Sequence, residues 1–334
     1  MTKVLITGAA GFIGSHVCRH CINLGMEVVA LDDLSGGFIE NIPEAANFIK
    51  LSITDYEQLK LLFEKEKFDY VYHLAAYAAE GLSHFIRKFN YENNLIGSIN
   101  LINLSVLHNI KCFVFTSSIA VYGSAQTPMT ENTIPIPEDP YGIAKYSVEL
   151  DLMAAKQMFG LNYIIFRSHN VYGENQNIAD KYRNVIGIFI NQILKNEPLT
   201  VFGDGKQKRA FSYIDDVAPI IAKSTLNKNA YGEVFNLGGE IPYTINELVN
   251  VISDSMNITP EINYLPERKE TKIAYSNHNK IKKYFDINEA TPLKIGIDKM
   301  VKWAYGFGCK PTKNFTNIEI PYNLPKSWEI KEHD

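Results

Sequence analysis

The stretch Lys3-Val-Leu-Ile-Thr7-Gly8-Ala9-Ala10-Gly11-Phe12-Ile13-Gly14 decides how this chain of 334 residues folds. Its apolar first half predicts a short strand, and the residues from Gly11 to Leu24 predict a helix, with small residues in the turn between them. Small residues let the backbone pass close to a pyrophosphate, and a helix N-terminus offers oriented N–H groups and partial positive charge. A glycine turn in this position is the context that dinucleotide binding requires. We therefore expect a dinucleotide to be held by Gly8, Gly11, Phe12, Ile13 and Gly14.

A carboxylate at the end of the second predicted strand indicates which dinucleotide binds. That strand, Glu27–Asp32, ends roughly 20 residues beyond the turn. The Asp32 carboxylate can accept hydrogen bonds from both ribose hydroxyls of NAD and would repel a 2′-phosphate. No arginine follows at Asp33–Gly37, which favours NAD over NADP. The alternative is that Asp32 only caps the end of its strand.

Short apolar runs alternate with amphipathic stretches through the first half of the chain. This alternation indicates an α/β protein with βαβ units and a Rossmann-type, doubly wound parallel sheet that is covered on both faces. The predicted strands are Val4–Thr7, Glu27–Asp32, Asn47–Lys50, Tyr70–Leu74, Cys112–Ser117 and Asn162–Arg167, and the predicted helices are Gly11–Leu24, Tyr56–Glu66, Tyr91–Asn109 and Tyr141–Phe159.

After about residue 173 the alternation weakens, which predicts a smaller mixed C-terminal domain for the substrate. We expect residues 1–172 to form the cofactor-binding domain, joined by returning segments near 206–238 that include Phe211–Ser224 and Val234–Gly238. Residues 173–205 and 239–334 would form the second domain. The tail after Gly308 is irregular, and the sequence indicates no role for it.

Composition and charge exclude several classes of partner. The formal net charge of −4 gives no general attraction to nucleic acid or to anionic membranes. No apolar run reaches membrane-spanning length, and the chain begins with a strand rather than a signal peptide. The four cysteines, Cys18, Cys21, Cys112 and Cys309, lack zinc-type spacing. We expect a cytoplasmic protein with free thiols and no metal site.

The pair Tyr141 and Lys145 lies in the predicted helix Tyr141–Phe159. Residues at i and i+4 share one helix face, so the ammonium group can lie beside the phenol. A neighbouring cation favours the phenolate and lowers the tyrosine pKa toward the range of a useful base. Such pairs also arise by chance, so the rest of the chain decides whether this one is catalytic.

With a cofactor turn in place, the chain resembles the extended short-chain dehydrogenase/reductase family. It is most similar to the nucleotide-sugar epimerase/dehydratase branch, and within it to UDP-glucose 4-epimerases. The resemblance covers most of the chain and rests on Thr7–Gly14, His73-Leu-Ala-Ala76, Asn94-x-x-Gly97, Thr116-Ser-Ser118, Val121-Tyr-Gly123, Tyr141–Lys145, Arg167-Ser-His-Asn-Val-Tyr-Gly173, Gly203-Asp-Gly205 with Arg209, Tyr213-Ile-Asp-Asp216 and Phe235-Asn-Leu-Gly238.

The resemblance assigns roles to particular residues. It implies that Ser118 joins Tyr141 and Lys145 in a catalytic triad, and that Lys145 also holds the nicotinamide ribose. Asn94 is assigned either to the cofactor site or to packing of its helix. The family commonly has an acidic residue on the adenine where Ser52 stands, and Ser52 can accept that hydrogen bond more weakly. The further cofactor contacts are Ile53, Leu74, Ala75 and Ala76.

Two apolar residues restrict the reaction. The family's dehydratases carry an Asp-Glu pair directly after the catalytic hydroxyl, and the GDP-mannose 3,5-epimerase carries a cysteine at the second of these positions. Here they are Ile119 and Ala120, neither of which can transfer a proton. The resemblance then implies a 4-epimerase, in which Tyr141 removes the C4 hydroxyl proton while C4 hydride moves to NAD. The transient 4-keto sugar would turn over and take the hydride back on its other face.

The resemblance also implies that the substrate is a nucleotide-diphosphate sugar, preferably a UDP-sugar. Ala274 falls where UDP-galactose 4-epimerases control access of N-acetyl sugars, so UDP-GlcNAc and UDP-GalNAc are expected to fit; a shift of one residue would put Tyr275 there and reverse this. Arg87 or Arg183 would suit a uronic acid. The remaining expected contacts are Asn170, Asn184, Val185, Thr200, Phe202, Arg209 and Arg268.

Several alternatives stay open. On the same scaffold they are a UDP-uronate 4-epimerase or decarboxylase and a GDP-sugar epimerase or 4-dehydrogenase; from another class, the alternative is a non-catalytic NAD-binding protein. By analogy with the family we expect a homodimer that pairs the predicted helices Tyr91–Asn109 and Tyr141–Phe159, with apolar residues such as Leu101, Leu104 and Met153.

Overall fold

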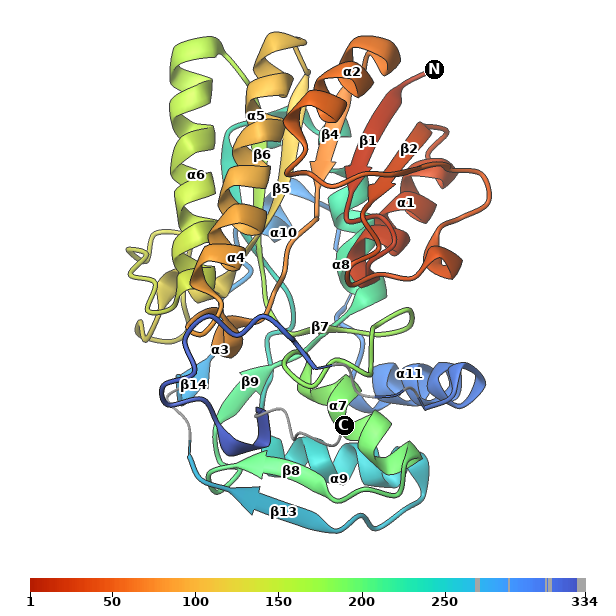
Figure 1. The fold of residues 1–334 in the computed structure, drawn as a ribbon, viewed down its shortest axis with the longest axis vertical. Coiled ribbons are helices and arrows are strands. Elements are labelled where there is room, and N and C mark those ends of the chain that lie inside the picture. The colour runs from red at the N-terminus through yellow and green to blue at the C-terminus, as the bar shows by residue number, and fades with distance from the viewer. Residues whose placement is uncertain (268–270, 288, 310, 312–313, 329–334) are drawn as a thin grey trace.

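The centre of the molecule is a seven-stranded, fully parallel sheet of the predicted Rossmann type (Figure 1). The structure is a computed structural model that describes residues 1–267, 271–287, 289–309, 311 and 314–328. The strand order is β11-β6-β5-β4-β1-β2-β3. The strands are β1 (Lys3–Thr7), β2 (Glu27–Asp32), β3 (Asn47–Lys50), β4 (Tyr70–His73), β5 (Cys112–Ser118), β6 (Tyr163–Ser168) and β11 (Glu233–Leu237), each within one residue of its predicted ends.

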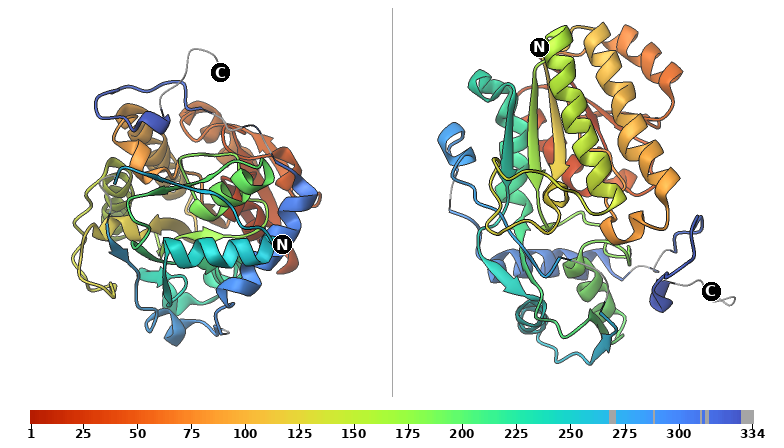
Figure 2. Two further views of the ribbon diagram at one scale, coloured as in Figure 1. Left: turned by 90° about the horizontal axis from the view of Figure 1, so that it is seen from below. Right: turned by 90° about the vertical axis from the view of Figure 1, so that its left-hand side faces the viewer.

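Both faces of this sheet are buried because successive side chains of a strand point to opposite sides. In β1, Val4 and Ile6 belong to one hydrophobic cluster and Leu5 to another. The first cluster includes residues of α1 (Phe12–Asn23) and α8 (Ile214–Lys223). The second includes residues of α2 (Tyr56–Glu66), α5 (Gly97–Leu107) and α6 (Pro140–Phe159). Figure 2 shows these helices as layers on the two sides of the strands.

The predicted helix Tyr91–Asn109 is wrong in its details. It consists of α4 (Arg87–Tyr91), a π-helical segment (Glu92–Ile96) and α5. A π turn closes its hydrogen bond over one residue more than an α-helical turn. The apolar periodicity of the sequence does not reveal this extra residue. Gly97 follows it and packs against Ile53, whose Cδ1 would lie 2.6 Å from a Cβ at this position. The π segment carries Asn94, and π turns often occur at functional sites.

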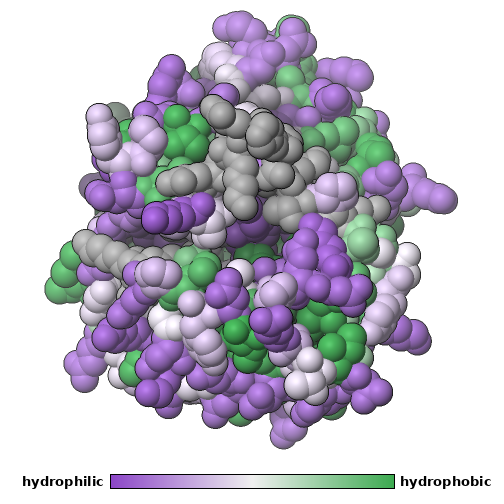
Figure 3. Space-filling view, turned by 60° about the horizontal axis from the view of Figure 1, so that its bottom comes forward, coloured by the Kyte–Doolittle hydropathy of each residue, from purple (hydrophilic) through white to green (hydrophobic). Residues whose placement is uncertain are grey.

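Small sheets and helices form the lower part of the molecule in Figure 1. Strands β12-β9-β14, β13-β8 and β10-β7 form three separate sheets, and together with the large sheet they confirm the predicted fold class. The outer face of this part is mostly hydrophilic, with small hydrophobic patches (Figure 3). No helix in the described ranges is long and apolar enough to cross a membrane.

The remaining elements connect or extend these layers. The strands are β7 (Val171–Tyr172), β8 (Leu199–Phe202), β9 (Lys208–Ala210), β10 (Ser212–Tyr213), β12 (Pro242–Thr244), β13 (Ile262–Leu265) and β14 (Ile273–Ala274). The helices are α3 (Glu80–Ser83), α7 (Val185–Leu194), α9 (Ile245–Met256), α10 (Ile281–Tyr284) and α11 (Leu293–Phe307). The 3₁₀ turns are Ile39–Asn41, Ile119–Tyr122, Ser224–Leu226, Lys228–Ala230 and Lys326–Trp328.

A buried ion pair fastens α6 to the sheet. The Arg167 guanidinium on β6 contacts the Glu149 carboxylate on α6 at 2.6 Å, and these side chains are 4% and 0% exposed. Ser117 Oγ donates to Glu149 at 2.5 Å, and Arg167 Nη1 donates to the Tyr122 hydroxyl at 2.8 Å. The network therefore fixes the helix that carries Tyr141 against the end of β5.

Replacing Glu149 by Gln should lower the free energy of unfolding by about 3–5 kcal/mol, because it leaves the buried Arg167 charge unpaired. The measurement is urea unfolding followed by circular dichroism. Glu92→Gln is the matched control, since its ion pair with Lys88 is 53% and 79% exposed and is expected to contribute less than about 1 kcal/mol. Equal effects of the two substitutions would contradict this role of the pair.

Candidate active site

A cavity of about 1510 Å³ opens where the carboxyl ends of the parallel strands face the C-terminal elements. The chain runs outward from β1 to β2 and β3 on one side and then returns to β4 on the other side of β1, so the strand order reverses between β1 and β4. Ligands of doubly wound sheets bind at such a switch point. The volume exceeds the roughly 300–1,000 Å³ of a pocket for one small ligand. The cavity is therefore large enough for a dinucleotide and a second nucleotide.

The glycine turn packs backbone against backbone at two positions where a side chain would not fit. Gly8 has φ +71°, and a Cβ there would lie 2.6 Å from the Ala75 backbone nitrogen. A Cβ on Gly14 would collide with the Gly8 carbonyl oxygen. Gly11 caps α1, so the free N–H groups of its first turn, at Phe12 and Ile13, face the cavity. These residues fit a pyrophosphate.

Asp32 lines the cavity and also caps the turn. Its Oδ2 accepts from the Ala10 N–H at 3.0 Å, and its Oδ1 accepts from the Leu34 N–H at 2.8 Å. Burial raises the pKa of this carboxyl group, and the two backbone hydrogen bonds oppose the rise. A carboxylate has about four acceptor sites, so capping and ribose binding are compatible.

Two residues expected at the cofactor do not reach the cavity wall. The Ser52 hydroxyl bonds Thr54 Oγ1 at 2.9 Å, while Leu51 and Ile53 line the cavity beside it. Asn94 is 1% exposed, accepts from the Tyr77 N–H at 2.8 Å and donates to the Tyr77 carbonyl at 3.0 Å. Asn94 thus positions the segment that follows β4, in agreement with the packing alternative. Leu74, Ala75 and Ala76 all line the cavity.

The three residues of the expected triad converge on the cavity from two elements. Ser118 is the last residue of β5, and Tyr141 lies in the first turn of α6. Asp139 caps this helix by accepting from the Gly142 N–H at 2.9 Å, and Pro140 starts it. Lys145 is 2% exposed, and its Nζ donates to the Thr116 carbonyl at 2.8 Å. The cap and the sheet edge therefore set the geometry of the triad.

The electrostatic expectation for Tyr141 is not met by the protein groups alone. Burial raises the pKa of the Tyr141 phenol, and the hydrogen bond with Ser118 lowers it only in part. Burial also lowers the pKa of the Lys145 ammonium to about 7. Lys145 Nζ is 5.8 Å from the centre of the Tyr141 ring. Desolvation is therefore the largest cause of both pKa shifts, which sequence spacing cannot show.

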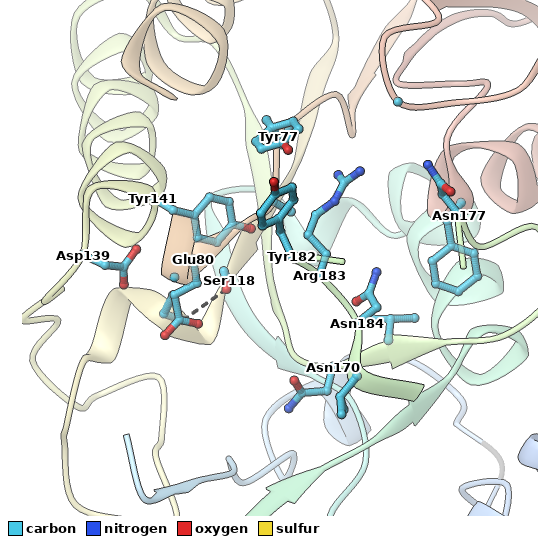
Figure 4. Close-up of a pocket in the computed structure, with 18 of the residues that line it drawn as sticks. Tyr77, Glu80, Ser118, Asp139, Tyr141, Asn170, Asn177, Tyr182, Arg183 and Asn184 are labelled. Atoms are coloured by element: carbon cyan, nitrogen blue, oxygen red, sulfur yellow. Dashed lines mark hydrogen bonds between the residues drawn. The ribbon is translucent and has the colours of Figure 1, made fainter. Parts of the chain in front are cut away.

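Charged and aromatic side chains line the end of the cavity where the sugar is expected (Figure 4), and among them is Arg183, one of the two arginines that the sequence suggested for a uronic acid. Arg183 pairs with Asp180 at 2.6 Å and lies 4.9 Å from the centre of the Tyr77 ring. Arg183 lines the cavity, whereas Arg87 is exposed and outside its wall. The cluster of charged and aromatic residues just before α7 was the feature of the sequence that could have indicated this part of the cavity wall. The other residues that line this end are Glu80, His84, Asp139, Asn177 and Tyr182.

Most residues expected around the nucleotide sugar line the cavity. Ala274 is one of them and Tyr275 is not. Thr200 Oγ1 accepts from Gln192 Nε2 at 3.0 Å, so this hydroxyl already has a protein donor. Arg268 lies outside the described residues. The others that line the cavity are Asn170, Asn184, Val185, Phe202 and Arg209.

Part of the C-terminal tail, to which the sequence assigned nothing, lines this cavity. Residues 314–328 form a strap that runs across the front of the molecule in Figure 1. The Glu319 carboxylate accepts from the N–H groups of Lys88 and Phe89 at 2.7 and 2.8 Å. Trp328 is 4% exposed, and its ring lies 5.3 Å from the Tyr182 ring. The strap supplies part of the cavity wall through Tyr322, Asn323, Pro325, Lys326 and Trp328.

Comparison with known proteins identifies the family of this site. The NAD dependent epimerase/dehydratase family matches residues 4–238. The chain belongs to this family. It is an NAD-dependent sugar-nucleotide epimerase, so the non-catalytic alternative no longer applies.

Solved structures of the family share nearly the whole fold. The UDP-glucose 4-epimerase of Thermotoga maritima, solved with UDP-glucose, is 34% identical with a TM-score of 0.85, over 90% of this chain and 98% of that one. The UDP-N-acetylglucosamine 4-epimerase of Methanobrevibacter ruminantium, in complex with UDP-N-acetylmuramic acid, is 33% identical with a TM-score of 0.83, over 90% and 97%. The UDP-glucuronic acid 4-epimerase of Bacillus cereus, with UDP-glucuronic acid and NAD, is 28% identical with a TM-score of 0.83, over 92% and 100%.

Gly8→Ala should weaken NAD binding at least 100-fold, because its Cβ would push the turn away from the segment that follows β4. Gly25→Ala is the matched control. Gly25 also has a positive φ, +76°, but no atom lies within 4 Å of an added Cβ, so only backbone strain of about 1–2 kcal/mol is expected. Calorimetric titration of the stripped proteins with NAD measures both affinities. Equal losses would show that steric closure of the turn is unimportant.

The buried Lys145 should make stability of the NAD-free protein rise with pH. Its pKa falls from 10.5 to about 7 on folding, so between these values the unfolded chain holds a proton that the folded protein has released. Below pH 7 both states are protonated, and the contribution is constant. The unfolding free energy of the natural protein relative to Lys145→Met should increase from pH 7 to pH 9, by at most about 1.4 kcal/mol per pH unit. A constant or falling difference would refute the shift.

Proposed function

We propose that this enzyme is a UDP-sugar 4-epimerase that works through a transient 4-keto sugar. The observation that carries the proposal is the meeting of Ser118, Tyr141 and Lys145 at a cavity whose turn fits a dinucleotide. Ile119 and Ala120 line the same cavity directly after Ser118 and carry no acid or base. Ser118, Tyr141 and Lys145, together with a bound dinucleotide, are sufficient to oxidise and reduce one carbon of a sugar.

Each side chain has a definite task in this proposal. Tyr141 takes the proton of the C4 hydroxyl, and Ser118 donates a hydrogen bond to the same oxygen as it becomes a carbonyl. NAD supplies the acceptor and later donor of the C4 hydride. Lys145, whose pKa of about 7 lets it exchange protons at neutral pH, supports the phenolate electrostatically. The cofactor ends in its starting state, so one substrate suffices.

The sugar is proposed from the wall around Ala274. This residue is 8% exposed and packs in a cluster with Val121, Tyr122 and Met129. A methyl group here leaves more room than the neighbouring Tyr275 would. We therefore propose that UDP-Glc and UDP-Gal are substrates and that UDP-GlcNAc and UDP-GalNAc also fit, in keeping with the named activity of the Methanobrevibacter relative.

A second candidate is epimerisation of a UDP-uronate. The observation in its favour is Arg183, a guanidinium at the sugar end of the cavity that could pair with a substrate carboxylate. The Bacillus cereus relative acts on such a sugar by name. Against it stands the Asp180 carboxylate, which already pairs with Arg183 at 2.6 Å.

We also propose a division into two domains and a homodimeric assembly. Residues 1–172 with the segments near 206–238 would bind NAD, and residues 173–205 and 239–334 the nucleotide sugar. A homodimer through α5 and α6 stays our proposal, but its apolar residues need correction: Leu101 and Leu104 are fully buried within the protomer, whereas Leu107 and Met158 are 64% and 76% exposed. A cytoplasmic location with free thiols also stays our proposal.

Incubation with UDP-glucose, UDP-GlcNAc, UDP-glucuronate and GDP-mannose, followed by NMR of the products, tests this function. We expect the C4 epimers of UDP-glucose and UDP-GlcNAc and no free NADH. Tyr141→Phe should lower kcat at least about 100-fold, because general acid–base catalysis is lost, while NAD stays bound. Accumulation of stoichiometric NADH, or full activity of Tyr141→Phe, would refute the proposal.

A further inference from the structure

The proposed reaction leaves one carboxylate at the sugar end of the cavity without a task. Glu80 is the first residue of α3 and lines the cavity. In Figure 4 its side chain lies beside Ser118 and near Tyr141, and these three residues come from three segments of the chain. The negative charge of Glu80 is among the causes that raise the pKa of the Tyr141 phenol, which places the two groups within electrostatic reach.

A single hydroxyl fixes Glu80 relative to Tyr141. Ser83 Oγ donates to the Glu80 carbonyl oxygen at 2.6 Å and accepts from the Tyr141 N–H at 3.2 Å. Ser83 is 1% exposed, so this bridge lies inside the protein. The first turn of α3 and the first turn of α6 are therefore held together at the residues that face the sugar.

The strap of residues 314–328 braces the same turn from outside. A Cβ on Gly81 would lie 3.2 Å from Trp328 Cη2, so the indole ring packs directly on the backbone next to Glu80. The Glu319 N–H donates to the Phe85 carbonyl at 2.8 Å. These contacts fix the backbone around Glu80, so its carboxylate, although exposed, extends from a fixed position on the cavity wall.

Oxidation at C4 creates a use for a base at this place. A carbonyl at C4 makes the hydrogens on the neighbouring carbons, C3 and C5, acidic. A carboxylate base combined with a phenol that stabilises the enolate oxygen is a known arrangement for removing such a hydrogen. Glu80 and Tyr141 provide these two parts, although the positions after Ser118 are apolar.

We propose that Glu80 is a second proton-transfer group of this enzyme, which removes and returns a hydrogen on a carbon next to C4 while C4 is a carbonyl. This inference rests on the proposed function, because the neighbouring hydrogens are acidic only after C4 is oxidised. It adds an activity, reversible enolisation of the bound sugar, to inversion at C4.

The step balances without another reactant. The C–H electron pair forms the C=C bond of the enolate, the carbonyl π electrons move to the C4 oxygen, and the proton moves to the Glu80 carboxylate. The Ser118 hydroxyl and the Tyr141 phenol donate hydrogen bonds to that oxygen. Returning the proton restores the ketone. Glu80 is exposed and lines the cavity, so its proton can exchange with solvent between the two halves of the step.

Turnover in D₂O distinguishes this activity from epimerisation alone. The holoenzyme is incubated with whichever of UDP-glucose, UDP-GlcNAc and UDP-glucuronate it epimerises, and the sugar protons are followed by ¹H NMR. We expect loss of the H3 or H5 signal during turnover, while H4 keeps its protium because that hydrogen travels as a hydride. The signal that disappears identifies the carbon that Glu80 faces.

Substitutions assign the exchange to Glu80. Glu80→Gln should lower the deuterium incorporated per C4 inversion at least tenfold, and Glu92→Gln, at an exposed carboxylate paired with Lys88, should leave this ratio unchanged. The NAD bound per protein shows that each variant is folded. C4 inversion by the natural enzyme without exchange at C3 or C5, or exchange that persists in Glu80→Gln, would overturn the inference. Failure to invert C4 in any of the sugars would instead refute the proposed function.

Discussion

The buried contact between Glu149 and Arg167 is the constraint on which the active site depends. It joins α6 to β6, and through the Ser117 hydroxyl it also reaches the end of β5. Breaking such a pair is costly because the remaining charge has no water around it. The residue after Ser117 is the expected catalytic hydroxyl, and the helix that carries Glu149 also carries Tyr141 and Lys145. The relative positions of Ser118, Tyr141 and Lys145 therefore depend on a buried ion pair that does not itself line the cavity.

Burial gives the same groups their chemical character. A fully buried lysine with a pKa near 7 and a phenol with a raised pKa do not form a phenolate–ammonium pair by themselves. The positive charge of the oxidised nicotinamide ring would favour the phenolate in the same low-dielectric space. The Tyr141 phenol would thus be a better base with the oxidised cofactor bound than in the protein alone.

The sugar end of the cavity is assembled from segments far apart in the sequence. Asn94 in the π turn holds the backbone of Tyr77, Ser83 ties α3 to α6, and Trp328 packs on Gly81. The strap covers a turn that would otherwise be exposed on its outer side. The loop after β4, the residues before α7 and the C-terminal strap therefore all contribute to the wall of the cavity.

The sequence by itself determined the parallel sheet, the glycine turn, Asp32 and the Tyr141–Lys145 pair, because these depend on local periodicity and on spacing within one element. It also led to Ser118 and Ala274 through ordered motifs. It did not reveal the π turn before α5, the hidden position of Asn94 or the burial of Leu101 and Leu104 in the protomer core. Only the tertiary structure brought Glu80 and Trp328 to the cavity and chose Arg183 over Arg87, because long-range packing decides which side chains of separate loops meet. It also decided the pKa of Lys145, because desolvation depends on everything that surrounds a charge.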